Sequence, residues 1–368
     1  MVKWVKRTGL VLAVTFLALT VINASWLAAA PKGYAKLLAH RGTMQQFSHK
    51  RLASEDCTAT RIEAPVHDYL ENTAPGLLMA DGLGAYMIEV DVAPTADGRI
   101  ALFHDRALDC RTNGTGEVRA ATLAQLKALD AGYGYTADGG KTFPLRGKTG
   151  YIPSIEEAVT AVPAVPLLYN LKAKSPNEAQ LLIAALQAAD RDVVKIGDAF
   201  AAPEAELPAI RAAFPGVWAY SATGIRACTK AYLLSGWFTI VPAACQGGTI
   251  AVPLNYQWAF AGWPNTLQAR MAAAGGHVIL TGPYGSGQAP AGLDLPEQLG
   301  QIPSTFTGTV WVDDMWVIGP ALHPAANHRN AREEAETAAG LEARRKAREL
   351  GCARSGYQPK IAHWPGQG

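Results

Sequence analysis

The stretch YMIEVDVAPTADGRIALFHD, residues 86–105, predicts two β-strands joined by a tight turn. Residues 86–92 and 99–105 are rich in the branched and aromatic side chains that favour strands, and the Pro, Asp and Gly between them favour a turn. Glu89 and Asp91 are two residues apart, so on a strand both side chains point to the same face. The stretch therefore indicates a packed strand that carries two acidic groups on one side.

Strand-like and helix-like segments alternate on both sides of this stretch, from residue 35 to about residue 325. The predicted strands are 35–40, 86–92, 99–105, 165–174, 193–198, 216–222, 238–243, 277–282 and 307–314. The predicted helices are 76–85, 122–130, 154–162, 177–190, 206–214 and 266–276, and capping Thr or Ser residues begin two of them. Strands that alternate with helices argue for a parallel sheet. About eight strands over this length favour a closed (β/α)8 TIM barrel with inserted loops over an open doubly wound sheet.

The first thirty residues differ from the rest of the chain. A basic start, MVKWVKR, precedes a long apolar run. This arrangement predicts a secretory signal peptide or a signal anchor at residues 1–30, and therefore export to the periplasm or the extracellular space. The run is just long enough to span a bilayer, and small residues at Ala24 and Ala28–Ala30 permit cleavage, so both forms stay open. In the anchored form, residues 8–30 would attach the protein to a membrane.

The composition suits a globular protein with a large core, because 49% of the 368 residues are hydrophobic and 17% are charged. The leader holds three of the 33 basic residues and none of the 31 acidic ones, so the rest of the chain is nearly neutral. A near-neutral body lacks the basic surface that nucleic acid requires, and we exclude that class of partner.

Three parts of the chain are predicted. Residues 1–30 form the signal or anchor, residues 35–325 the barrel, and residues 326–368 a charged helical tail with little apolar face, expected to be solvated.

The chain has five cysteines, and their spacing matches no zinc motif. In an exported protein, disulfides are the expected state. The candidate pairs are Cys57 with Cys110 and Cys228 with Cys245. Cys352, in the charged tail, would be left over.

Polar and charged side chains recur where the predicted strands end. The first strand ends in His40 and Arg41, the third in His104, and the fourth near Asn170 and Lys172. In a parallel barrel the carboxyl ends of all strands meet at one mouth, which is where catalytic groups lie. Two imidazoles, two cations and the acidic pair of residues 86–92 should therefore converge.

The acidic pair suggests a cation. Burying Glu89 and Asp91 side by side is costly unless a positive charge lies between them. A polar edge strand with both acids in water would avoid this cost, but the flanking Ile88, Val90 and Val92 indicate a packed strand. The pattern predicts a hard divalent ion, Ca²⁺ or Mg²⁺.

The remaining groups suggest a phosphate ester as ligand. His40 and His104 are suited to general acid and base catalysis, and the sequence does not say which does which. Arg41 and Lys172 supply the positive charge that a phosphate oxygen requires. The other histidines, including His49, are interpreted as structural.

Five blocks carry a family resemblance as a set: AHRG (39–42), ENTAPG (71–76), IEVDV (88–92), DGRIALFHD (97–105) and IPSIEEAV (152–159). In order and spacing they resemble the glycerophosphodiester phosphodiesterase family across residues 38–159, with a looser likeness to about residue 320. The resemblance implies a (β/α)8 barrel that hydrolyses glycerol phosphodiesters with a bound divalent ion. It also implies roles for single residues: His40 and His104 as the acid/base pair, Arg41 at the phosphate, Glu71 and Asn72 shaping the substrate site, and Glu89 and Asp91 at the metal.

The chain departs from the family pattern at the fourth strand. Members usually have a glutamate two residues before the lysine, and LLYNLKAK (167–174) has Asn170 there. An amide oxygen can bind Ca²⁺ or Mg²⁺ but carries no charge, so weaker or altered metal binding is expected.

Three long segments have no counterpart in the motifs. About thirty residues, including Cys57, separate HRG from ENT. The loop 129–150, with Tyr133, Tyr135, Lys141 and Arg146, could select the alcohol group or be plain surface. The aromatic segment 254–265, with Tyr256, Trp258, Phe260 and Trp263, could contact lipid but is expected to pack under the barrel rim.

The leading interpretation is an exported, metal-dependent phosphoric diester hydrolase that acts on glycerophosphodiesters and releases an alcohol and glycerol phosphate. One alternative is a phospholipase D-like hydrolase of lysophospholipids or sphingolipids. The other is a non-catalytic protein that binds phosphate headgroups, an option that Asn170 leaves open.

Overall fold

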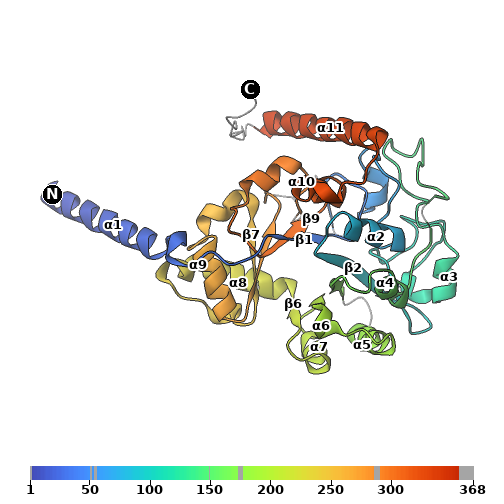
Figure 1. Ribbon diagram of the computed structural model, residues 1–368, viewed down its shortest axis with the longest axis horizontal. Coiled ribbons are helices and arrows are strands. Elements are labelled where there is room, and N and C mark those ends of the chain that lie inside the picture. The colour runs from blue at the N-terminus through green and yellow to red at the C-terminus, as the bar shows by residue number, and fades with distance from the viewer. Residues whose placement is uncertain are drawn as a thin grey trace.

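The computed structural model describes residues 2–49, 52–53, 56–148, 150–172, 177–285 and 291–355 (Figure 1). Its centre is a nearly closed barrel of eight parallel strands with helices around it, which confirms the predicted fold class. In order around the barrel, the strands are β6 (Trp218–Tyr220), β5 (Ala199–Ala201), β4 (Leu167–Asn170), β2 (Met87–Pro94), β1 (Lys36–Ala39), β9 (Thr309–Val312), β8 (His277–Thr281) and β7 (Thr249–Pro253).

The barrel closes in two ways. β1 pairs in parallel with β9, with Leu37 opposite Val310, so the first and last strands are neighbours. Between β6 and β7 a side-chain contact takes the place of a ladder: the Trp218 indole donates to the Thr249 hydroxyl at 2.9 Å and stacks on His277, with ring centroids 4.4 Å apart.

Helices cover the outside of the barrel: α2 (Ala74–Gly82), α4 (Ile155–Ala161), α5 (Glu178–Ala188), α6 (Val193–Ile196), α7 (Leu207–Ala213), α8 (Ala222–Ser235), α9 (Asn265–Ala273) and α10 (Met315–Leu322). Hydroxyl side chains at Thr73, Ser154 and Ser221 cap three of them, each accepting a hydrogen bond from the backbone of the first turn. The caps fix where each loop at the mouth enters its helix.

Alternating side chains of β2 point to opposite faces of the strand, and this separates the apolar core residues from the two acids. Ile88, Val90 and Val92 point outward into the main core, against the helices. Met87 points inward and joins an apolar layer that closes the barrel interior. Glu89 and Asp91 share the inward face of Met87 but lie nearer the carboxyl end of the strand, so the two acids lie above this layer.

One predicted strand is shorter than expected, and two strand predictions are wrong. Residues 99–105 contain only β3 (Ile100–Leu102), which pairs antiparallel with β2 outside the barrel. Residues 193–198 form α6, because the Asp192 side chain caps its start and Gly197, at φ +91°, ends it. Residues 238–243 are not a strand: the 3-10 helices η4 (Gly236–Phe238) and η5 (Ala243–Cys245) bound an irregular segment.

A second hydrophobic cluster lies on the mouth side of the barrel and includes Met44, Leu126 and Tyr135. It is built from the segments before α2 and between β3 and α4, with η2 (Thr58–Arg61), η3 (Val118–Ala120) and α3 (Leu123–Lys127). The Cys57–Cys110 disulfide joins its two halves, and Cys228–Cys245 joins α8 to η5. Both predicted pairings are confirmed.

The ends of the chain form the two longest helices, α1 (Val2–Ile22) and α11 (Ala331–Ser355). In Figure 1, α1 extends away from the barrel beside α9, and η1 (Ser25–Leu27) follows it. The short helices η6 (Leu254–Ala259), η7 (Pro296–Gln301) and η8 (Pro324–Ala326) complete the loops. Within the predicted tail, residues 331–355 form α11, but the expectation of full solvation is wrong. Thr337 is buried against Trp316, and buried Arg344 pairs with Glu63 at 2.7 Å and with Asp314 at 2.8 Å.

Candidate active site

Two backbone turns meet at the mouth. Arg41 and Asn72 both have left-handed backbones, with φ 59° and 55°, and the Asn72 N–H donates to the Arg41 carbonyl at 3.0 Å. Non-glycine residues seldom adopt this conformation, and they gather at functional sites. Gly42, at φ 79°, permits the close approach, because a Cβ there would lie 3.0 Å from the Gly76 carbonyl oxygen. The HRG and ENT motifs are therefore one structural unit.

The two acids of β2 are fully buried and firmly held. The amide nitrogen of Asn170 donates to Glu89 Oε1 at 2.8 Å and to Asp91 Oδ1 at 3.1 Å. The side chain of Asn72 donates to Asp91 Oδ2 at 2.9 Å, and the backbone N–H of Arg41 donates to Glu89 Oε2 at 2.9 Å. Three segments of the chain thus position this pair.

Two cations balance the acids. The Arg41 guanidinium lies 3.0 Å from Glu71 and 3.4 Å from Asp91. The Lys172 ammonium lies 2.9 Å from Asp91 and donates to the His104 carbonyl at 3.0 Å. The predicted gathering of cations beside the acidic pair is present.

The two acids respond differently to this setting. Burial and the neighbouring Asp91 raise the pKa of Glu89 to about 6. Burial acts against ionisation of Asp91 as well, but Lys172, His104 and Arg41 hold its pKa well below the ordinary value. Asp91 is therefore the permanent negative charge of the pair.

His40 is oriented by an acid from the last strand. Its Nδ1 lies 2.8 Å from Asp313 Oδ1, and buried Asp313 also accepts from the Gly292 N–H at 2.7 Å. The other ring nitrogen, Nε2, accepts from Arg41 Nε at 3.2 Å. An imidazole held by a carboxylate at Nδ1 keeps Nε2 for proton transfer.

His104 has the same arrangement. Its Nδ1 lies 2.6 Å from Asp105 Oδ1. Arg111 donates two hydrogen bonds to Asp105, from Nε at 2.7 Å and from Nη2 at 3.2 Å. Burial, assisted by the nearby charge of Arg41, lowers the pKa of His104 to about 4. The His104 ring is therefore neutral at pH 7.

Arg111 links the two sides of the site, and the motifs gave no hint of it. Besides Asp105, its Nη1 lies 2.7 Å from Glu71 and 2.7 Å from the Tyr135 hydroxyl, and its Nη2 donates to Thr58 at 2.6 Å. Burial acts against ionisation of Glu71, but Arg111 and Arg41 hold its pKa below the usual range. The Arg111 guanidinium thus fixes the acids that hold Arg41 and His104.

Asp313 was also missed, although a signal for it was present. It directly follows β9, whose predicted strand 307–314 ends in VDD, and strand ends had located the other site residues. His49, which we expected to be structural, also reaches this acid: its Nε2 lies 3.6 Å from Asp313 Oδ2.

The loop 129–150 and the aromatic segment 254–265 each have some aromatic residues in the core and others at the surface. Tyr135 is buried and holds Arg111, whereas Arg146 stacks on exposed Tyr133 at the surface. Phe260 is buried, and Trp263 packs on Phe306, as expected for residues under the rim. Trp258, 75% exposed, and its neighbour Tyr256 contradict that expectation.

The site can be tested for its fit to a divalent ion. Within the described ranges no group of three or more His, Cys, Asp or Glu side chains is arranged to hold a metal. Oxygens of Glu89 and Asp91 nevertheless converge on a single atom, the amide nitrogen of Asn170. Turning that amide end for end would replace this nitrogen by the amide oxygen, so that three oxygens would lie close together. The donors fit a hard cation such as Ca²⁺ or Mg²⁺ with one neutral ligand.

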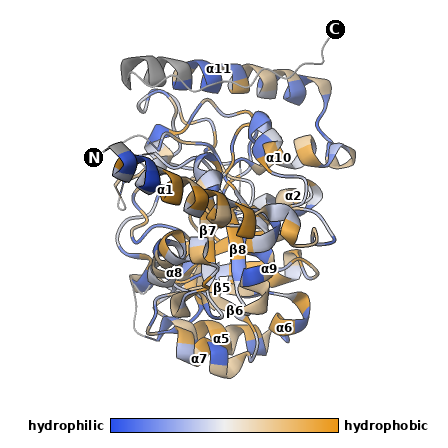
Figure 2. Cartoon of the chain, turned by 90° about the vertical axis from the view of Figure 1, so that its left-hand side faces the viewer, coloured by the Kyte–Doolittle hydropathy of each residue, from blue (hydrophilic) through white to orange (hydrophobic). Residues whose placement is uncertain are grey.

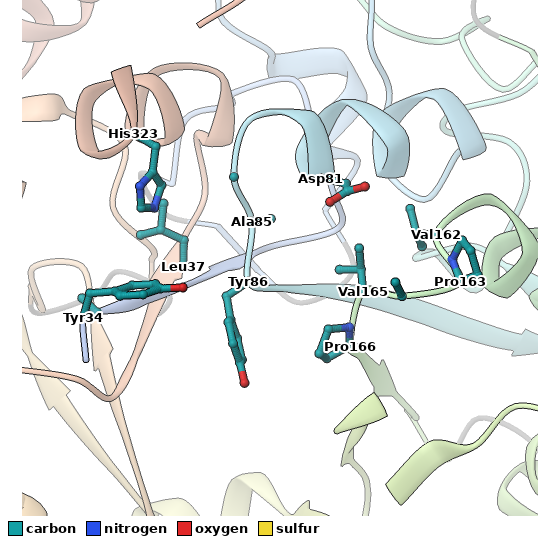
Figure 3. A pocket seen from close by; sticks show the side chains of 13 residues that line it. Tyr34, Leu37, Asp81, Ala85, Tyr86, Val162, Pro163, Val165, Pro166 and His323 are labelled. Carbon is teal, nitrogen blue, oxygen red and sulfur yellow. The ribbon is translucent and has the colours of Figure 1, made fainter. Parts of the chain in front are cut away.

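Two cavities differ in their relation to these groups. One of about 30 Å³, the space of a single water, is lined by residues that include His104, Asp105 and Lys172. Another of about 690 Å³ lies at the opposite end of the barrel, where Tyr34, Leu37, Tyr86 and Pro166 surround the starts of β1, β2 and β4 (Figure 3). Its volume does not make it the reaction centre, because the charged groups lie at the carboxyl ends of the strands.

The Cys57–Cys110 disulfide should support activity as well as stability. Thr58 and Arg111, the residues that follow the two cysteines, hydrogen-bond to each other beside Glu71. Replacing both cysteines with serine should lower kcat at least tenfold and remove about 4 kcal/mol from the free energy of unfolding, by loop closure over 53 residues. The matched control is serine at Cys228 and Cys245, which should lower stability by about 3 kcal/mol over 17 residues and leave kcat unchanged. Equal kcat in the two variants would contradict the link to the site.

The fold and the site define a class: a (β/α)8 barrel with paired imidazoles, acids and cations at its mouth, a set suited to an anionic ester. Residues 40–205, fewer than half of the 368 residues, match the family described as glycerophosphoryl diester phosphodiesterase.

Sequence relatives carry the same name. A glycerophosphodiester phosphodiesterase of Bacillus subtilis (strain 168) is 34% identical over 149 residues, which are 38% of this chain and 49% of the relative. One from Caldanaerobacter subterraneus is 37% identical over 105 residues, 28% of this chain and 40% of the relative. The chain thus aligns with half or less of the length of these relatives.

Solved structures show the fold over a longer span. A glycerophosphodiester phosphodiesterase of Agrobacterium tumefaciens superposes with a TM-score of 0.51 at 20% identity, over 77% of this chain and 99% of that one. A glycerophosphoryl diester phosphodiesterase domain of Mycobacterium tuberculosis superposes with a TM-score of 0.54 at 18% identity, over 79% of this chain and 100% of that one.

Proposed function

We propose that the protein hydrolyses glycerophosphodiesters to an alcohol and glycerol phosphate by acid–base catalysis with His40 and His104. One observation carries the proposal: each imidazole is oriented through Nδ1 by its own acid, Asp313 or Asp105, and Arg41 contacts both His40 and the acidic pair. The family match and the names of the relatives support the same reaction class.

Charge at the mouth suits the phosphodiester anion. Arg41 and Lys172 would bind its non-bridging oxygens, and the guanidinium can do so with two parallel hydrogen bonds. Glu71 and Asn72 contact Arg41 and Asp91, so their proposed role is to position these groups.

The low pKa of His104 supports one assignment of the proton transfers. Because this ring is neutral, we assign it as the general base that takes a proton from the attacking hydroxyl. The oxygen–phosphorus bond forms, the bond to the leaving alcohol breaks, and His40, which has to enter this step protonated at Nε2 with Asp313 at its Nδ1, donates that proton to the alkoxide. Exchange with solvent then removes the proton gained by His104 and replaces the one lost by His40. If the attacking hydroxyl is water, the products form directly. If it is the neighbouring glycerol hydroxyl, a cyclic phosphate forms first and is then hydrolysed.

A divalent ion would be held by Glu89, Asp91 and the Asn170 amide oxygen. When bound, it would supply positive charge that stabilises the phosphoryl oxygens. Asn170 carries no charge, so weaker binding than at a site with three carboxylates is part of the proposal.

A panel of glycerophosphodiesters assayed with Ca²⁺, with Mg²⁺ and with EDTA tests the function. Glycerol phosphate should be released, and EDTA should reduce the rate at least tenfold in a way that added metal restores. Binding of the esters without turnover under all conditions would contradict hydrolysis. Turnover that is insensitive to EDTA would contradict only the metal.

With the divalent ion saturating, so that Glu89, whose pKa is raised to about 6, stays ionised, the acidic limb of kcat/KM should fall far below the ordinary range for histidine. The protonated ring of His104 is disfavoured by burial and by Arg41, so the base should stay active as the pH falls below 6.5 and lose activity only near its pKa of about 4. The check is kcat/KM against pH, with circular dichroism to confirm folding at each point. A limb at pH 6.5 would contradict the assignment of His104 as base.

A second substrate class is favoured by one observation. Exposed aromatic rings of Tyr256, Trp258 and Tyr284 lie together after β7 and β8, at the mouth end of the barrel. Such a surface suits an acyl chain, as in a phospholipase D-like reaction on lysophospholipids or sphingolipids. Rates on glycerophosphocholine and lysophosphatidylcholine would separate the two: a higher kcat/KM on the lysolipid would favour this alternative.

We also propose that the protein is exported, to the periplasm or the extracellular space. Two disulfides are typical of an oxidising compartment, and Lys3–Ile22 is long and apolar enough to cross a membrane. Export of this kind places residues 8–30 at or in a bilayer during secretion.

A further inference from the structure

The segment that follows α1 is built into the barrel. Asn23 is only 5% exposed. Its side-chain amide donates to the Leu19 carbonyl at 2.8 Å and to the Trp237 carbonyl at 2.7 Å, and its Oδ1 accepts from Arg270 at 2.8 Å. Next to it, the Ser25 hydroxyl accepts from the Asn265 N–H at 3.0 Å at the start of α9. The junction is therefore a fixed contact with α8, η4 and α9.

This junction argues that α1 is retained. The small residues suited to signal cleavage, Ala24 and Ala28–Ala30, lie beside or after the folded residues Ser25–Leu27. Cleavage at any of these sites would remove Asn23, the hydrogen-bond partner of buried groups on η4 and α9. A segment this closely packed differs from the extended, accessible chain of a cleaved signal.

The helix has the features of a membrane span. Lys3–Ile22 has 20 residues and a mean hydropathy of 1.8, and none of it is buried. At 1.5 Å per residue its length is about 30 Å, the thickness of a bilayer core. Trp4 lies at one end and Trp26 just beyond the other, where interfacial aromatic residues are found. In Figure 2 most of α1 has the colour of hydrophobic residues, and its amino end has the colour of hydrophilic ones.

Exposed apolar side chains surround the point where α1 leaves the barrel. We call this set the docking face; it comprises Trp26 (74% exposed), Leu27 (52%), Leu234 (78%), Phe238 (60%) and Ile240 (56%). The hydrogen bond from Asn23 to the Trp237 carbonyl holds η4, which follows α8, against the carboxyl end of α1. Isolated exposed apolar residues are ordinary, but a cluster at the base of an apolar helix indicates a shared partner.

The charged residues between residues 207 and 293 are all basic. No Asp or Glu occurs from residue 207 to residue 293, whereas Arg211, Arg226, Lys230 and Arg270 lie within that span. All 31 acidic residues of the chain therefore lie outside residues 207–293, the span that contains α8, η4 and the segment after them. Lys230 lies one helical turn before Leu234 on α8, so a basic side chain borders the docking face, which suits a bilayer with anionic headgroups.

We propose that α1 is an uncleaved anchor and that the docking face rests in the outer interface of the same bilayer. The basic amino end of α1, with Lys3, Lys6 and Arg7, then lies on the cytoplasmic side and the barrel on the other. The barrel is held at one orientation to the lipid surface. This inference rests on the proposed export and is independent of the phosphodiesterase activity.

Spin labels on the full-length chain test the proposal. The chain, with Cys352→Ser, is reconstituted in vesicles of phosphatidylcholine mixed with phosphatidylglycerol, and a nitroxide is attached at Phe238→Cys. The matched control is Val194→Cys, an equally exposed apolar position on α6. The label at 238 should be at least about threefold less accessible to a water-soluble nickel chelate than the label at 194, and more accessible to oxygen. Equal accessibility at the two positions would overturn the docking face.

The mass of the intact chain isolated from membranes gives the second readout. Retention of the residues before Asn23 is expected. A mature protein that begins after Ala24 or at Ala28–Ala30 would overturn the anchor and the docking face together. Neither readout depends on turnover, so failure of the membrane proposal and failure of the proposed reaction are distinguishable.

Discussion

Replacing His104 with alanine should lower kcat by about 10²- to 10⁴-fold, and replacing His40 should have an effect of similar size. Each change removes a proton-transfer group whose partner acid stays in place, at 2.6 Å from Nδ1 for His104 and 2.8 Å for His40. Both rings are half-buried at the mouth, so the fold should tolerate the loss.

The matched control for these variants is His323→Ala. His323 lines the cavity at the opposite end of the barrel, far from the acidic pair in the strand direction. It should keep kcat within about threefold of the unchanged protein, as expected for sites away from the chemistry. Steady-state kinetics on a glycerophosphodiester, with circular dichroism for folding, provide the measurement. Losses below tenfold in both active-site variants would remove the two histidines from the mechanism.

Changing Asp313 to asparagine should reduce kcat by about 10³- to 10⁴-fold. The amide keeps the shape of the carboxyl but presents a donor or a weaker acceptor to His40 Nδ1, so the ring loses the tautomer and the charge support that it needs. Since Asp313 is buried and contacts no proposed phosphate ligand, KM should change little.

The adjacent acid provides the control. Asp314 accepts from Arg344 at 2.8 Å and caps α10, and within the part of the chain that the structure describes it forms no hydrogen bond or ion pair with either active-site histidine. Asp314→Asn should therefore lower the free energy of unfolding by about 1–3 kcal/mol and leave kcat unchanged. Chemical denaturation and kinetics on both variants distinguish the roles. A large drop in kcat for Asp314→Asn with none for Asp313→Asn would contradict the arrangement.

Most of the site could be located from the sequence alone, because the carboxyl ends of the parallel strands all lie at the same mouth of the barrel. His40 and Asn170 lie at or just beyond the ends of β1 and β4, and Asp91 lies opposite Asn170 on β2. Arg41 hydrogen-bonds to His40 and Glu89, and Asn170 hydrogen-bonds to both acids. The periodicity of two on β2 also placed both acids on one face and the aliphatic residues on the other. These inferences rely on local pattern and topology, which the sequence contains.

What was missed depends on contacts between distant segments. Asp313 faces His40 because β9 pairs with β1, with Val312 opposite Ala39, and no local pattern specifies that register. Arg111 acts through a folded insertion whose loops carry no periodic signal. The strand at 99–105 was recognised by its residue types, but its antiparallel pairing outside the barrel depends on which neighbour it meets.

The tail helix shows a similar limit. Its sequence is mostly charged, which favours a solvated surface, yet Arg344 is buried between Glu63 and Asp314. Charged residues can be buried when paired, and the partners here come from segments far away in sequence.

The comparison that tests the central claim most directly is turnover of a glycerophosphodiester by the unchanged protein and by the His40→Ala, His104→Ala double variant. If the two imidazoles act in one reaction centre, the double variant should lose about as much activity as the more damaged single variant, because removing either one already disables the shared step. Release of glycerol phosphate at the same rate by the unchanged and the double variant would contradict the account.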